Sequence, residues 1–126
     1  MNFDRLTNRV KSLIQDVVAL ASSRKHQYIV PEHILKVILN DNDATTLELI
    51  EKAGGNVVEL KERVDDVLSK IPEVMGSTVQ SLMSQDFSRV MSEAEILATQ
   101  AGDKFVTLER VLQALVLTNG GAAEIL

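Results

Sequence analysis

The residues of this chain best suited to chemistry are its two histidines, His26 and His33, which lie seven positions apart. A zinc site needs three or four ligands, and the chain has no cysteine and no H-E-x-x-H motif to complete such a set. The pattern favours a histidine in a loop followed by a histidine in the first turn of a helix. We therefore expect no metal site.

The remaining reactive side chains form no catalytic group. The neighbouring carboxylates Asp65 and Asp66, and the pair Glu93 and Glu95, point to different parts of a helix surface, where carboxylates are ordinarily solvated. No serine lies in a G-x-S-x-G motif, and no G-x-x-x-x-G-K-[ST] sequence is present to bind nucleotide phosphates. The sequence predicts no catalytic residues, so we do not expect this chain to be an enzyme.

Composition limits the partners. Of the 126 residues, 45% are hydrophobic and 25% are charged, as in an ordinary soluble domain, and the net charge is −5. The 13 lysines and arginines are scattered, so we expect no nucleic-acid partner. The N-terminus does not resemble a signal peptide, and no apolar stretch approaches the roughly 20 residues of a membrane span. We expect a cytoplasmic protein with no membrane partner.

The elements that position these side chains come from an internal duplication. A shift of 77 positions places Leu6 on Met83 and Glu32 on Glu109, and it matches apolar residues throughout segments 6–50 and 83–126. Helical periodicity alone would not preserve loop length in this way. In the first helix the matched residues are Leu6, Val10, Leu13, Ile14, Val17, Leu20 and Ala21, with Met83, Phe87, Val90, Met91, Ala94, Leu97 and Ala98.

Apolar periodicity and capping residues then predict the helices of each copy. The expected helices of the first copy are 8–24 after Thr7, 31–40 from Pro31, one from residue 43 or 44 to Gly54, and 57–70 after Asn56. Those of the second copy are 85–101 after Ser84 and 108–118 after Thr107. The second helix of each copy is almost wholly apolar, so both should lie centrally in the core.

The predicted fold is all-α, a compact helical bundle of two pseudo-symmetric copies of a four-helix unit. We assign the first copy to 6–70, a connection to 71–82, and the second copy to 83–126. After residue 50 the first copy continues through Gly54 and a fourth helix, but the second copy stops at the equivalent point, residues 125–126, so it is truncated. We therefore expect these 126 residues to be a piece of a longer protein.

The duplicated unit resembles the Clp N-terminal repeat domain, which precedes the ATPase modules of Clp unfoldases. The motif of that family, an extended aromatic–aliphatic step followed by [PT]-E-H-[IL]-L, is found at 28–35 as YIVPEHIL and in degenerate form at 105–112 as FVTLERVL. Segments 4–8, 71–74 and 84–86 are most similar to the branch found in ClpB-type disaggregases. The resemblance covers the whole chain and implies a single domain at 1–126.

The resemblance implies a non-catalytic module of an ATP-dependent chaperone, which captures unfolded or aggregated polypeptide for threading by downstream ATPase modules. ATP and Mg²⁺ would belong to those modules, and this chain would hold no cofactor. The chain alone would be a monomer and the full-length protein a homohexamer. The alternative on the same fold is an adaptor-docking domain of a ClpA- or ClpC-type unfoldase. A helical DNA-binding or signalling domain is disfavoured by the acidic charge.

The resemblance also implies three candidate client-binding residues beside an apolar groove: Thr7, Asp103 and Glu109. Each has a structural interpretation as well. Thr7 caps a helix, Asp103 follows a glycine in a turn, and Glu109 lies in a first helical turn, where the helix dipole favours a carboxylate. One departure from the family is Arg110, which stands where close relatives often have an apolar residue. It would narrow the groove or add charge to it.

Overall fold

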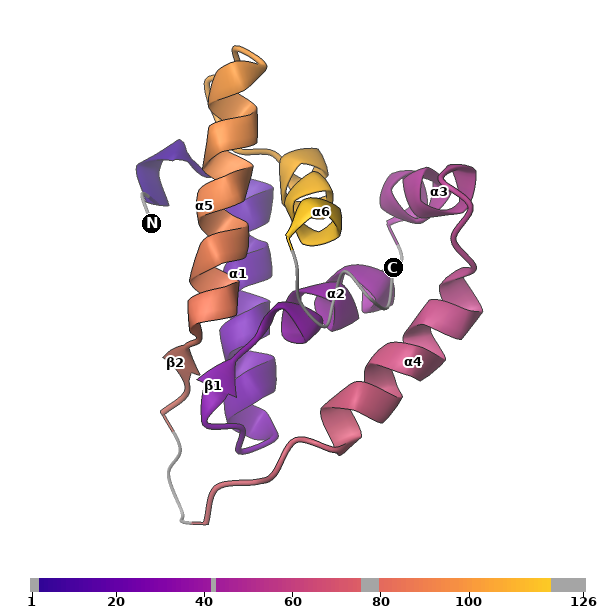
Figure 1. Cartoon of the computed structure of the whole chain (residues 1–126), viewed down its shortest axis with the longest axis vertical. Coiled ribbons are helices and arrows are strands. Elements are labelled where there is room, and N and C mark those ends of the chain that lie inside the picture. Colours follow the sequence, from indigo (N-terminus) through magenta and orange to yellow (C-terminus); the bar gives the residue numbers. More distant parts are fainter. Residues whose placement is uncertain (1–2, 42, 76–79, 119–126) are drawn as a thin grey trace.

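The computed structural model describes residues 3–41, 43–75 and 80–118, and these parts of the chain are mainly helical (Figure 1). Their elements are η1 (Phe3–Arg5), α1 (Asn8–Ser23), β1 (Tyr28–Ile29), α2 (Pro31–Asn40), α3 (Ala44–Lys52), α4 (Val57–Ser69), β2 (Leu82–Met83), α5 (Gln85–Gln100) and α6 (Leu108–Leu117). The predicted all-α class is confirmed. The predicted end of the second copy, at 119–126, lies outside the described residues, as does part of the connection, at 76–79.

The first helix of each copy starts in the predicted way. The Thr7 side chain accepts a hydrogen bond from the Val10 N–H at 3.2 Å, and Ser84 accepts one from the Phe87 N–H at 3.1 Å. Thr107 stands at the predicted N-cap position of α6, which begins at Leu108, but its side chain makes no capping hydrogen bond. The Thr107 backbone carbonyl accepts the first bonds of α6 instead.

The ends of α1 and α5 also match across the two copies. Each helix is followed by a residue with a left-handed backbone, Lys25 (φ 58°) in the first copy and Gly102 (φ 75°) in the second. The next N–H then closes the helix on a carbonyl five residues back, from His26 to Ala21 at 2.9 Å and from Asp103 to Ala98 at 2.8 Å. The duplication therefore extends to the turn geometry.

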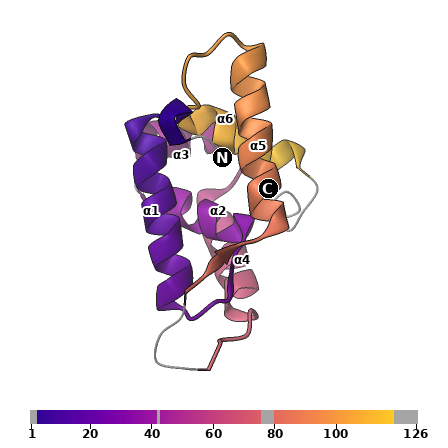
Figure 2. The same cartoon turned by 90° about the vertical axis from the view of Figure 1, so that its left-hand side faces the viewer.

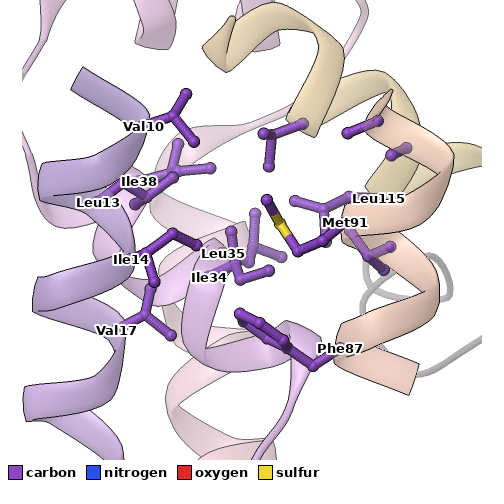
Figure 3. Packing of buried hydrophobic residues seen from close by; sticks show 14 of the residues in the cluster. Val10, Leu13, Ile14, Val17, Ile34, Leu35, Ile38, Phe87, Met91 and Leu115 are labelled. Carbon is purple, nitrogen blue, oxygen red and sulfur yellow. The ribbon is translucent and has the colours of Figure 1, made fainter. Parts of the chain in front are cut away.

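The two copies enclose one core. Figure 2 shows α1 and α5 as the two long helices that flank α2 and α6. From α1, Val10, Leu13, Ile14 and Val17 point toward Phe87 and Met91 of α5, with Ile34 and Leu35 of α2 between them (Figure 3). All of these side chains are buried, and each contributes roughly 1.5–3 kcal/mol to folding by leaving water.

A reciprocal pairing of extended residues joins the copies, and the sequence pattern did not predict it. Strand β1 pairs in parallel with β2, with Ile29 opposite Met83, and an isolated parallel bridge pairs Leu6 with Val106. The Ser84 N–H donates to the Ile29 carbonyl at 3.0 Å, and the Thr7 N–H donates to the Val106 carbonyl at 3.2 Å. The shift of 77 positions turns one bond into the other with the copies exchanged. Such an exchange is expected when two equal units are related by an approximate twofold axis.

The second helices of the two copies are not equally buried, contrary to the expectation from their apolar content. Helix α2 packs against α4, and Leu39 near its end is 0% exposed. The equivalent residue of α6, Val116, is 59% exposed. Within the described residues, no element of the second copy covers that face as α4 covers α2. The structure therefore leaves an apolar helix face accessible.

Candidate functional site

The exposed face of α6 forms one wall of an apolar groove of about 550 Å³. Helix α3 and the start of α4 form the other wall, on the side of the molecule away from η1 and β2 (Figure 1). The lining residues are Leu49, Ile50, Ala53, Gly55, Leu60, Glu109, Arg110, Leu112, Gln113, Val116 and Leu117. Seven of these are aliphatic side chains, and Leu49, Val116 and Leu117 are exposed. The groove therefore offers apolar surface that a partner can cover.

The polar residues of the groove belong to the first turns of α6. Arg110 donates from Nε to the Asp103 carboxylate at 2.8 Å and from Nη1 to Gln113 at 2.7 Å. The first of these bonds is an ion pair whose side chains are about a quarter exposed, 25% for Arg110 and 30% for Asp103. Arg110 therefore lies along the wall of the groove with its charge already paired.

The three predicted client-binding residues occupy different positions relative to the groove. Glu109 lines it directly. Asp103 does not line the groove, but it forms an ion pair with Arg110, which does line it. Thr7 caps α1 and donates its backbone N–H to Val106, just before α6. Arg5 adds a further link, since its guanidinium donates to the Asp103 carbonyl at 3.3 Å. Their part in client binding stays a prediction.

The histidines lie where the sequence pattern placed them, in a loop and in the first turn of α2, but their surroundings were not predicted. His26 is 2% exposed and His33 is 0% exposed, and Nδ1 of His26 lies 2.8 Å from Nε2 of His33. Burial lowers the pKa of His33 to about 4, with a smaller contribution from the neighbouring His26. Burial also lowers the pKa of His26, and the positive charge of Arg24 lowers it further, while Glu73 opposes this shift.

The duplication itself could have revealed this pair. The shift of 77 positions places His26 on Asp103 and His33 on Arg110. Both copies therefore tie the loop after their first helix to the first turn of their second helix, through a histidine pair in one case and an ion pair in the other. Two polar residues that keep a common spacing in both copies are a signal of contact.

The described residues contain neither a metal-binding cluster nor a membrane span. Among residues 3–41, 43–75 and 80–118, no three His, Cys, Asp or Glu side chains gather closely enough to hold a metal ion. In the same ranges, no helix is both long and apolar enough to cross a membrane.

Two copies of a helical unit around one core, with an apolar groove beside the second copy, define a helical repeat domain. The sequence matches the family model of the Clp repeat N-terminal domain over residues 5–126. The chain belongs to this family. It is similar to the N-terminal region of the chaperone protein ClpB of Mesorhizobium japonicum, with 45% identity over 93% of this chain, and of Agrobacterium fabrum, with 39% identity over 97%.

The chain spans only 14% of the length of either of these relatives. Among solved structures, it is similar to the Hsp104 N-terminal domain of Candida albicans, with a TM-score of 0.83, 21% identity, and coverage of 95% of this chain and 78% of that one. It is also similar to a ClpV N-domain solved in complex with a VipB peptide, with a TM-score of 0.73, 17% identity, and coverage of 95% and 75%. These likenesses show that the fold is that of Clp N-domains.

Proposed function

We propose that this chain is the client-capturing N-terminal module of a Clp-type ATP-dependent chaperone, and that it binds unfolded or aggregated polypeptide. The observation that carries the proposal is the apolar groove between α3, α4 and α6. Unfolded chains expose apolar side chains in many sequence contexts, and a groove lined mainly by aliphatic groups accepts them without demanding particular hydrogen bonds.

The asymmetry between the copies supports the groove as the binding surface. Leu39 and Val116 are equivalent residues, yet Leu39 is fully buried and Val116 is 59% exposed, and α2 packs against α4 whereas α6 has no such neighbour from its own copy within the described parts of the chain. The solved ClpV N-domain with its VipB peptide also supports the proposal, because it indicates that this fold can accept a polypeptide partner.

The proposal extends to the protein that carries this domain. The relatives are about seven times longer than the chain, so capture would be followed by threading through ATPase modules outside it. ATP and Mg²⁺ would bind in those modules. The assembled protein would be a homohexamer acting in the cytoplasm, with the isolated chain a monomer.

A matched pair of substitutions tests the groove. Val116→Ser removes an exposed valine of the groove, whereas Val58→Ser removes one of similar exposure, 67% against 59%, on α4 outside it. We expect Val116→Ser to weaken binding of a permanently unfolded model protein about fivefold, because about 1 kcal/mol of apolar contact is lost. Val58→Ser should leave binding unchanged. Fluorescence anisotropy with the labelled model protein measures both, and equal effects would reject the groove.

Two further titrations distinguish client capture from adaptor docking and from a groove that is covered in the longer protein. A folded adaptor protein that competes for the groove while unfolded protein fails to bind would favour the adaptor-docking alternative. The same titration should also be made with the natural polypeptide that contains this chain. Binding that is seen only with the shorter chain would mean that later residues cover the α6 face, and it would end the proposal.

A further inference from the structure

The buried histidine pair can be assigned its proton positions from its contacts. The Val30 N–H donates to Nδ1 of His33 at 3.0 Å, so that nitrogen carries no proton. Neutral His33 must then carry its proton on Nε2, which faces Nδ1 of His26 at 2.8 Å. His26 accepts at Nδ1 and is neutral with its proton on Nε2. The arrangement requires both rings to be uncharged.

Adding a proton to either ring breaks this arrangement. An imidazolium has an N–H at both nitrogens. Protonated His33 would direct an N–H at the Val30 N–H, and protonated His26 would direct one at the His33 Nε2–H. In both cases two donors face each other, and one hydrogen bond of the chain Val30–His33–His26 must be lost.

The loop that contains His26 is also where the connection between the copies is attached. The Val74 N–H donates to the Lys25 carbonyl at 2.7 Å, the Ser81 hydroxyl to the His26 carbonyl at 2.6 Å, and the Leu82 N–H to the Gln27 carbonyl at 2.9 Å. These three acceptors are consecutive residues. If this loop lost its order, these three hydrogen bonds would be lost with it. The connection would then be released from the first copy on both sides of residues 76–79, and so would β2.

The equivalent loop of the second copy is held in a parallel way but with different chemistry. The Asp103 carbonyl accepts from Arg5, as the His26 carbonyl accepts from Ser81. Arg5 also donates to the Thr99 side chain. In the first copy, Ser81 contacts Ser22, which is the equivalent of Thr99. The tie to the second helix, however, is the Asp103–Arg110 ion pair, which contains no histidine.

We propose that the His26–His33 pair is an acid-sensitive latch that holds the first copy to the connection and to β2. Mild acid raises the fraction of molecules in which this end of the domain is open, while the equivalent tie in the second copy stays closed. The charged groups that act on the latch are Arg24, which follows α1, and Glu73 in the connection. From α2 the facing group is His33 itself. Because these are the only two histidines of the chain, no other side chain has an ordinary pKa near 6.5.

The size of the response follows from linkage. In the opened state His33 titrates near 6.5, and in the closed state its pKa is about 4. Lowering the pH from 7 to 5 should therefore raise the opening equilibrium about 20-fold. We expect this increase, after correction for intrinsic exchange rates, in the hydrogen exchange of the Leu82 and Ser84 amides. The Thr7 amide, which is the equivalent of the Ser84 amide, should not change in this range, and neither should the Val106 amide, which donates to the Arg5 carbonyl.

Two matched variants and one direct measurement test the latch. His33→Gln should abolish the acid response of the Leu82 and Ser84 amides, whereas Arg110→Gln, the same replacement at the equivalent position, should retain it. If His33→Gln does not fold, ¹⁵N-resolved NMR of the wild-type imidazoles decides the question. Both rings should be Nε2–H tautomers at pH 7, and His33 should stay neutral at pH 5. A ring that titrates near 6.5, a different His33 tautomer, or amide exchange at Leu82 that does not respond to acid would overturn the proposal.

Discussion

The ion pair between Asp103 and Arg110 provides the most direct test of how the second copy is built. The two side chains meet through one charge-assisted hydrogen bond of 2.8 Å, and they are 30% and 25% exposed. A fully exposed pair contributes about 0–1 kcal/mol, and hydrogen bonds to charged groups contribute about 1.5–3 kcal/mol. For this half-buried pair we expect a coupling free energy of about 1–2 kcal/mol.

A double-mutant cycle measures this coupling. Urea unfolding of the wild type, Asp103→Ala, Arg110→Ala and the double variant gives four free energies of unfolding, whose combination isolates the pair. The same cycle at Asp86 and Arg89 is the control, because that pair is 3.4 Å apart and more than half exposed. It should give less than about 0.5 kcal/mol.

Salt and client binding extend the test. Raising the salt concentration to 1 M should leave the Asp103–Arg110 coupling only partly reduced, since solvent reaches the pair incompletely. Removing Asp103 also leaves the Arg110 charge unpaired in the groove, so Asp103→Ala should weaken binding of an apolar client and Arg110→Ala should not. A coupling no larger than that of the control pair would refute the view that Asp103 acts by holding Arg110.

Three further outcomes follow from the structure. Thr7→Ala and Ser84→Ala should each lower the free energy of unfolding by about 1 kcal/mol, measured by urea denaturation, because they remove equivalent helix caps; a loss at only one site would contradict the equivalence of the copies. Phe87→Ala should cost about 3–5 kcal/mol, because Phe87 is fully buried, and a loss under 1 kcal/mol would show that the core collapses around it. Acid should destabilise the fold, because the folded pKa of His33 is depressed. The stability that neutral His33 contributes is complete above pH 6.5 and is lost as the pH falls toward about 4, a total of up to about 3 kcal/mol. Thermal unfolding of the wild type over this pH range should show the loss, and thermal unfolding of His33→Gln should not.

The helices and their equivalence could be predicted from the sequence because they depend on local rules. Apolar spacing gives the buried face of α1 and α5, and hydroxyl residues at Thr7 and Ser84 satisfy the free N–H groups of the first turn. The constant shift between the copies carries the same information twice. It also predicts equal loop lengths, and the structure places a left-handed residue at the matching positions Lys25 and Gly102.

The strand pairing and the uneven burial of the second helices could not be predicted in this way. A strand of two residues has no measurable period, and its partner is the other copy, which lies far away in sequence. Apolar content makes α2 and α6 look alike, but burial depends on what packs against each helix. Helix α4 packs against α2, in which Leu39 is fully buried, whereas Val116 of α6 faces a groove.

The sequence by itself determined the family and the duplicated helical unit. It also determined which residue types link the loop after the first helix to the first turn of the second helix in each copy. Each of these follows from residue identity at a fixed spacing. Only the tertiary structure decided that His26 and His33 are buried against each other, that Asp103 holds Arg110, and that Glu109 alone of the three candidate residues lines the groove. The physical reason is that burial and pairing are properties of distance in space. A pattern along the chain states which side chains can meet, and the packing of the two copies sets which of them do.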